Sequence, residues 1–234
     1  MRFLEKWLIC VVLFCIFAAD ASADLLIAWD GGEGANSATN ATDISGTLFT
    51  DALNDVLASG GGSTDGTFGP VLTGASSSGP VYRVVDQGGK NRLTFEIVNN
   101  TGSDLNLESI VFDYSAWFPD SPLSVRVQYR EGSLALPDFT EITTVTVAGI
   151  AGKLGDYEDF AVSLSGLSDT VLADGQAATF DLVAYNANLN NTAGGFDNVG
   201  ITGSVVPEPA TLGLFSLTAV ILLICRRVSF GGMF

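Results

Sequence analysis

The sequence predicts an all-β fold, a single antiparallel β-sandwich of the jelly-roll kind. Three observations support this. In the stretch 123–129 every second residue from Leu123 to Tyr129 is apolar, which is typical of a strand with one buried face. Clusters of Gly, Asn, Asp and Ser separate this stretch from others like it. Helical periodicity is almost absent from residues 24–204, which we take as the folded domain.

Short strands are expected along the whole domain. They fall at residues 25–29, 81–86, 92–98, 109–114, 123–129, 142–147, 160–164, 179–185 and 199–202. The exception is the stretch 50–58, where Leu53, Val56 and Leu57 have helical spacing and predict at most a short surface helix. The stretches on either side, 31–45 and 59–78, are rich in Gly, Ser, Thr and Asn and are predicted to be long loops.

The first 23 residues have the pattern of a signal peptide. Arg2 and Lys6 precede an apolar helix at residues 7–19, and Ala21 and Ala23 provide the small residues that signal peptidase recognises. We therefore expect export, with cleavage before Asp24.

The other end of the chain has the pattern of a short membrane anchor. Pro207, Glu208 and Pro209 precede an uncharged, mostly apolar run at 210–225, and Arg226 and Arg227 follow it. The run is slightly short of the roughly 20 residues that usually cross a bilayer, so it would span with tilt or local thinning. The two arginines then favour a cytoplasmic end. A buried core helix is the alternative, but such helices seldom lie next to a doubly basic chain end.

These tail residues closely resemble the PEP-CTERM sorting signal of exported bacterial proteins, and the resemblance covers about residues 205–229. It implies that the tail holds the chain in the inner membrane until a membrane protease, exosortase, recognises and cuts it. The protein would then reside on the cell surface or in the extracellular matrix. The residues after Arg227, which end in a short tail at 230–234, extend beyond the usual end of the signal.

Composition excludes several functions. The chain has no His, and its three Cys residues lie in the two terminal segments, so His-based catalytic triads, ordinary zinc sites and disulfides are excluded from the domain. The formal net charge is −16, which disfavours nucleic acid and anionic lipid as partners. This charge suits uncharged glycans or divalent cations, although a solvated acidic surface without a ligand is the simpler explanation.

Carboxylates are the remaining catalytic groups. The densest group is at 156–159, where Asp156 and Glu158 would share one strand face. A pair of carboxylates is what a glycoside hydrolase requires, so a secreted glycan-active hydrolase is the alternative function. An exposed acidic loop is the simpler interpretation, and we expect no catalytic residue.

Three further acidic residues, Asp113, Asp181 and Asp197, lie in or beside predicted strands. Asp197 and Asn198 offer oxygen atoms for Ca²⁺, or they stabilise a turn through local hydrogen bonds. The turn is the simpler interpretation. Ca²⁺ is the only cofactor that the sequence suggests.

The best candidates for glycan contact are Trp117 and Phe118, a bulky pair in the turn after a strand, because sugar rings stack on aromatic faces. The alternative is a turn folded over the end of the core. Residues 90–203, ending in Phe196-Asp-Asn-Val, look like a common group of PEP-CTERM ectodomains and are similar to jelly-roll carbohydrate-binding modules. The sequence therefore predicts an exported protein of the surface or exopolysaccharide matrix, structural or glycan-interacting, without catalysis.

Overall fold

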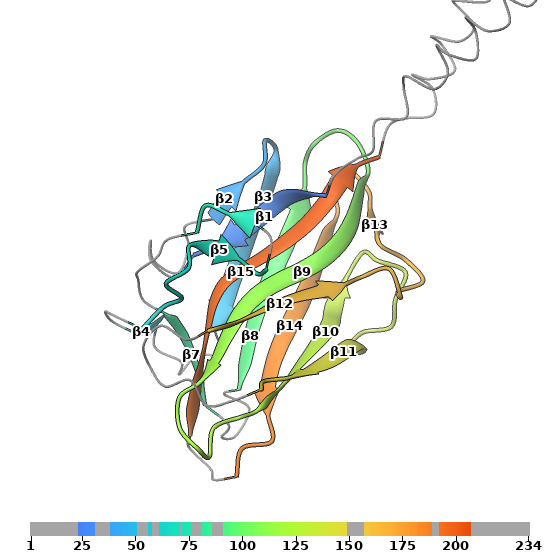
Figure 1. Cartoon of the computed structure of the whole chain (residues 1–234). Helices are drawn as coiled ribbons and strands as arrows, with labels where there is room; N and C mark the ends of the chain where they lie inside the picture. The colour runs from blue at the N-terminus through green and yellow to red at the C-terminus, as the bar shows by residue number, and fades with distance from the viewer. Residues whose placement is uncertain are drawn as a thin grey trace, which may run out of the picture.

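The computed structural model describes residues 23–30, 38–50, 56–57, 61–70, 72–75, 81–85, 91–148, 157–188 and 192–206. They form two antiparallel sheets that share one hydrophobic core, and a small two-stranded ribbon (Figure 1). Within this part of the chain every element is a strand, so the predicted all-β class and antiparallel sheets are confirmed.

The larger sheet has eight strands. Its main order is β12 (Glu158–Ser163), β9 (Leu105–Ala116), β15 (Ala193–Val205), β1 (Asp24–Trp29) and β2 (Ala38–Asn40), with β13 (Val171–Leu172) also beside β9. The chain of pairs continues from β15 to β7 (Val81–Val85) and β4 (Val56–Leu57).

The smaller sheet has five strands in the order β11 (Thr140–Thr146), β10 (Ser124–Gly132), β14 (Ala177–Tyr185), β8 (Arg92–Asn99) and β3 (Ile44–Thr50). The separate ribbon pairs β5 (Thr67–Phe68) with β6 (Leu72–Thr73).

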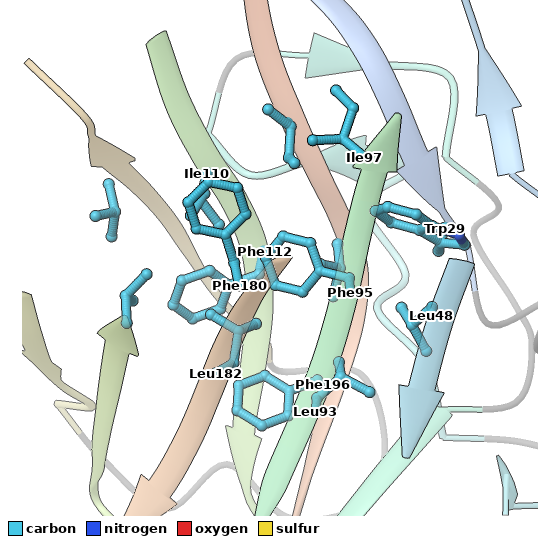
Figure 2. Close-up of a cluster of buried hydrophobic side chains, with 14 of the residues drawn as sticks. Trp29, Leu48, Leu93, Phe95, Ile97, Ile110, Phe112, Phe180, Leu182 and Phe196 are labelled. Atoms are coloured by element: carbon cyan, nitrogen blue, oxygen red, sulfur yellow. The ribbon is translucent and has the colours of Figure 1, made fainter. Parts of the chain in front are cut away.

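Aromatic side chains from both sheets form the centre of the core. Figure 2 shows Trp29, Phe112 and Phe196 of the larger sheet meeting Phe95 and Phe180 of the smaller one. The ring centroids of Trp29 and Phe95 are 5.7 Å apart, and those of Phe112 and Phe196 are 5.9 Å apart. Because strand side chains alternate between faces, the residues beside these aromatics point outward, and Asp113 is one of them.

The outer face of the larger sheet is also partly covered. Phe68 of the ribbon packs on Ala28 and Val111, with Leu25 and Leu72 at the edge of this small cluster. The Gly-rich segment that contains the ribbon therefore lies against the sheet and does not extend into solvent. This contact creates a second buried layer, outside the main core.

All nine predicted strands are confirmed, several with greater length than expected. The helix expected at 50–58 is wrong where the chain is described, because Thr50 ends β3 and Val56–Leu57 pair with β7. A stretch of nine residues is too short to form a stable helix in competition with strand pairing. The predicted loops at 31–45 and 59–78 contain β2, the start of β3 and the ribbon.

The two terminal signals lie outside the described residues. This applies to the predicted signal helix with Ala21, and to Pro207, Glu208, Pro209, Arg226 and Arg227. Among the described residues, no helix is long and apolar enough to span a membrane. The last described strand, β15, runs to Val205, directly before the predicted sorting signal.

Candidate functional site

Three carboxylates meet on the outer face of the larger sheet, and we call them, together with Asn198, the acidic centre. Asp113 lies on β9, Asp159 on β12 and Asp65 in the segment just before the ribbon. One carboxylate oxygen from each residue lies within 4.8 Å of the others. The pairing of β12 with β9 explains why Asp159 lies beside Asp113, since the two residues are directly opposite in the register.

Asn198 connects the centre to the middle of the sheet. It lies at an irregularity in the β15–β9 register, with a positive φ of 48°, an uncommon conformation for a residue other than glycine. Its Nδ2 donates to Asp113 Oδ2 at 2.7 Å. Both residues have 0% exposed surface, so this contact is sealed from solvent.

The Gly-rich segment is tied to the sheet through acidic side chains. The backbone N–H of Ser63 donates to Asp197 Oδ2 at 2.8 Å, and that of Gly69 donates to Asp113 Oδ1 at 3.2 Å. Asp65 in turn accepts hydrogen bonds from the Ser63 hydroxyl at 3.1 Å and from the Thr67 N–H at 2.9 Å. Two buried carboxylates of the sheet thus bind the backbone of a segment that has few apolar side chains of its own.

The predicted pair Asp197 and Asn198 takes up two different roles. Asp197 accepts from Ser63 and from the N–H of Asn198, at 3.0 Å, as expected of a turn-stabilising side chain. Asn198 instead faces the acidic centre through Asp113. The structure therefore brings only Asn198 of this pair to the group of carboxylates.

Gly69 allows the close contact between the segment and the sheet. Its φ is +56°, and a Cβ at this position would lie 2.8 Å from the carbonyl oxygen of Phe160 and 3.0 Å from Val111 Cβ. Only glycine fits such an approach without strain.

We expect Gly69→Ala to lower the free energy of unfolding by about 2 kcal/mol, from left-handed strain and from the backbone contact together. Urea denaturation measures this loss. Gly66→Ala is the matched control, since Gly66 has a φ of +75° in the same segment, and its added Cβ would approach only the Ala75 carbonyl, at 3.5 Å. Equal losses in the two variants would contradict the close contact at Gly69.

The ionisation of the centre is strongly perturbed. Burial raises the pKa of Asp113 from 3.8 to about 8; the hydrogen bond from Asn198 opposes this shift, and the charges of Asp159 and Asp65 add to it. Burial and the charge of Asp65 also raise the pKa of Asp159. Partial burial acts to raise the pKa of Asp65 too, but hydrogen bonds from Thr67 and Ser63 outweigh it, so that pKa is lowered.

This perturbation predicts a pH dependence of stability in buffer without divalent cations. Folded Asp113 keeps its proton up to about pH 8, whereas the ordinary value is 3.8, so its ionisation destabilises the folded state. The protonated Asp113 side chain contributes to the free energy of unfolding. This contribution is complete below about pH 4 and is lost as the pH rises through about 8. We expect the melting temperature of the wild type, relative to Asp113→Asn, to fall by about 5 °C or more between pH 5 and pH 9.

Asp159 and Asp65 are the charged groups that face Asp113. The ion pairs of the described residues all lie elsewhere, on Arg92 and Arg130. A constant difference between wild type and Asp113→Asn across this pH range would show that Asp113 is ionised throughout.

The centre has the chemistry of a cation site more than that of a hydrolase. Carboxylate and amide oxygens are the ligands that Ca²⁺ prefers. A hydrolytic acid must reach the bond that is cut, but Asp113 is fully buried beneath Gly69 and Asn198. Of the acidic pair considered from the sequence, Asp156 lies outside the described residues, and Glu158 accepts from the N–H of Ala148 at 2.8 Å.

A second polar cluster lies on the outer face of the smaller sheet, around Asp181. This fully buried carboxylate accepts from the Thr94 hydroxyl at 2.7 Å and from Gln128 Nε2 at 2.9 Å. Arg92 and Arg130 each approach it at 3.4 Å. The hydrogen bonds and the two arginines satisfy and compensate the charge of Asp181, which indicates a structural role.

The two predicted aromatic contacts have different environments. Trp117 is only 6% exposed and packs with Val81, Val85 and Ala193. Phe118 is 44% exposed, and its N–H donates to the Ser121 hydroxyl, which donates in turn to the Ala193 carbonyl. Phe118 is therefore the member of the pair that presents its ring to solvent, on a turn that is firmly tied to β15.

Sequence reasoning did not bring Asp65, Asp113 and Asp159 together. The sequence marks Asp113 as a carboxylate in a strand, includes Asp159 in the acidic group 156–159, and places Asp65 in a predicted loop. The Asp197-Asn198 pair is the one sequence signal that suggests a cation in this part of the fold.

No family model and no curated protein matches the sequence. Among solved structures, a cleaved adhesin domain of Lys-gingipain from Porphyromonas gingivalis is 10% identical with a TM-score of 0.36, covering 77% of this chain and 99% of that one. A family 11 carbohydrate-binding module from Clostridium thermocellum is 9% identical with a TM-score of 0.33, covering 81% and 99%. A Stig cyclase from Fischerella is 13% identical with a TM-score of 0.34, covering 80% and 90%. Likeness at this level carries no argument about function, and the sandwich assignment rests on the strand pairing.

Proposed function

We propose that this chain is an exported protein of the cell surface or extracellular polysaccharide matrix, which acts through structure or glycan contact and not through catalysis. Signal peptidase removes the leader, the apolar tail holds the chain in the inner membrane, and an exosortase recognises Pro207-Glu208-Pro209. The terminal sequence patterns support this route.

The observation that supports the non-catalytic role is the burial of Asp113 within the acidic centre. Its most perturbed carboxylate, Asp113, has 0% exposed surface, so a polymer cannot reach it while the Gly-rich segment is in place. The alternative, a secreted glycan-active hydrolase, requires two accessible carboxylates on either side of the bond.

Phe118 is the side chain that we propose for glycan contact. It is exposed, its backbone is held by Ser121, and an aromatic ring offers a flat stacking surface for a sugar. The neighbouring Trp117 is buried in the cluster that contains Val81 and anchors this turn to the sheet.

A glycan array probed with the full chain in mild detergent tests this contact. Phe118→Ala should lose most of the binding signal, whereas Phe139→Ala, which removes a 58% exposed ring from the turn between β10 and β11, should retain it. Binding that survives Phe118→Ala would place the glycan elsewhere. An absence of binding in wild type and variants alike would favour the structural role.

Fractionation of cells with and without an exosortase tests the sorting step. The strain that has the enzyme should release a shortened product to the surface or medium, and the strain that lacks it should keep the full-length chain in the membrane. The same size and location in both strains would contradict sorting by this route.

A further inference from the structure

We propose that the acidic centre binds one Ca²⁺ ion, held by oxygen atoms of Asp65, Asp113, Asp159 and Asn198, and that this ion fastens the segment 61–75 to the larger sheet. This inference does not depend on the proposed route of export or on glycan contact.

The geometry of the carboxylates fits a single ion. Their nearest oxygens lie within 4.8 Å of one another, and they come from three separate parts of the chain. Two oxygens on opposite sides of a Ca²⁺ ion, each at about 2.4 Å, are about 4.8 Å apart. All three carboxylates can therefore bind one ion after small side-chain movements, without a change of fold.

A buried polar atom points independently to a missing ligand. Asn198 has 0% exposed surface, and its Oδ1 has no hydrogen-bond partner in the described part of the chain. A buried amide oxygen without a hydrogen-bond donor lowers the stability of the folded state. Since Nδ2 of the same amide donates to Asp113, this side chain already faces the centre, and a small rotation would let Oδ1 approach the ion as a fourth oxygen ligand.

Asp159 shows the same deficiency. Its Oδ1 is buried and meets no N–H donor among the described residues, because its neighbours are the carboxyls of Asp65 and Asp113. Ionised carboxylates in a poorly solvated site repel one another, and either a retained proton or a bound cation relieves the repulsion. The described residues place no Arg or Lys in an ion pair with this group, so a divalent cation is the ligand that would allow all three carboxylates to ionise.

The ion would add to the hydrogen bonds that already hold the Gly-rich segment on the larger sheet. Asp113 and Asp197 bind the backbone of Gly69 and Ser63, while Asp65 accepts from Ser63 and Thr67 in its own segment and meets the sheet through the carboxyl of Asp159. A shared cation joins Asp65 to the two sheet carboxylates. Ca²⁺ fits better than Mg²⁺, because Mg²⁺ demands near-ideal octahedral geometry at shorter distances and usually keeps several waters.

The test measures melting of the full chain in mild detergent, after removal of metal, with EDTA, Ca²⁺ or Mg²⁺. A hundredfold excess of Ca²⁺ over its Kd should raise the melting temperature of the wild type by about 5–10 °C, with a smaller effect of Mg²⁺. Ca²⁺ should also slow hydrogen exchange at the Ser63 and Gly69 amides, which reports on the attachment of the segment.

Two variants and a control locate the ion. Asp65→Asn changes an exposed side chain, so the variant should fold normally in EDTA and bind Ca²⁺ at least tenfold more weakly. Asp113→Asn should lose the response to Ca²⁺, while its stability in EDTA at pH 8 equals or exceeds that of the wild type. Asp169→Asn is the matched control, because Asp169 accepts from the N–H two residues later, as Asp65 does, but in another turn.

The proposal is overturned if Ca²⁺ leaves melting and hydrogen exchange of the wild type unchanged. A Ca²⁺ response that survives in both Asp65→Asn and Asp113→Asn would show that the ion binds elsewhere. An equal response to Mg²⁺ would reject the assignment of Ca²⁺.

Discussion

Phe112→Ala is expected to lower the free energy of unfolding by about 3–5 kcal/mol, the range for large aromatic residues in protein cores. Phe112 is fully buried at the centre of β9, where its ring stacks on Phe160 at 5.1 Å and meets Phe196 at 5.9 Å. Its removal leaves a cavity in the core between the two sheets (Figure 2). Urea denaturation, followed by tryptophan fluorescence, measures the loss.

Phe139→Ala serves as the control for this change. It deletes the same side chain from a turn where the ring is 58% exposed, and we expect an effect within about 0.5 kcal/mol. If Phe112→Ala cost as little as this control, the two sheets would not share the packed core described above.

Asp181→Asn is expected to cost about 3 kcal/mol, because it breaks a buried charged network on the other sheet. The carboxylate binds Thr94, Gln128, Arg92 and Arg130. An amide of the same shape must turn an NH₂ group towards at least one of these donors. Arg92 loses its counter-charge, and Arg130 keeps only its pair with the exposed Glu131. The loss lies at the low end of the range for buried ion pairs, since the arginine side chains are 29% exposed and retain some hydration.

Asp138→Asn, an exposed carboxylate in the turn before β11, should leave stability within about 0.5 kcal/mol of the wild type under the same conditions. A cost for Asp181→Asn below about 1 kcal/mol would indicate that the network behaves as a surface ion pair.

The strands could be predicted because burial of one face imposes a period of two. Leu123 to Tyr129 follow this rule closely, and β10 occupies the same place in the chain. The N-terminal half of β15 could not be predicted in this way, because Gly194 and Gly195 have no side chains to show a pattern. These glycines are required by neighbours from distant segments, since a Cβ on Gly195 would lie 2.7 Å from the Trp117 ring.

The acidic centre could be predicted only in part. Asn198 stood out as an oxygen donor beside a strand, but the approach of Asp159 to Asp113 depends on the register between β12 and β9. Asp65 reaches the same place because buried carboxylates bind the backbone of its segment. Such contacts between distant segments leave no periodic signal in the sequence.

A crystal structure of the protein grown with Ca²⁺ would show whether the acidic centre holds an ion. We expect one strong density peak on the outer face of the larger sheet, about 2.3–2.6 Å from oxygens of Asp65, Asp113, Asp159 and Asn198. An empty centre under these conditions, with Asn198 Oδ1 still lacking a partner, would contradict the claim that a calcium ion fastens the segment 61–75 to the sandwich.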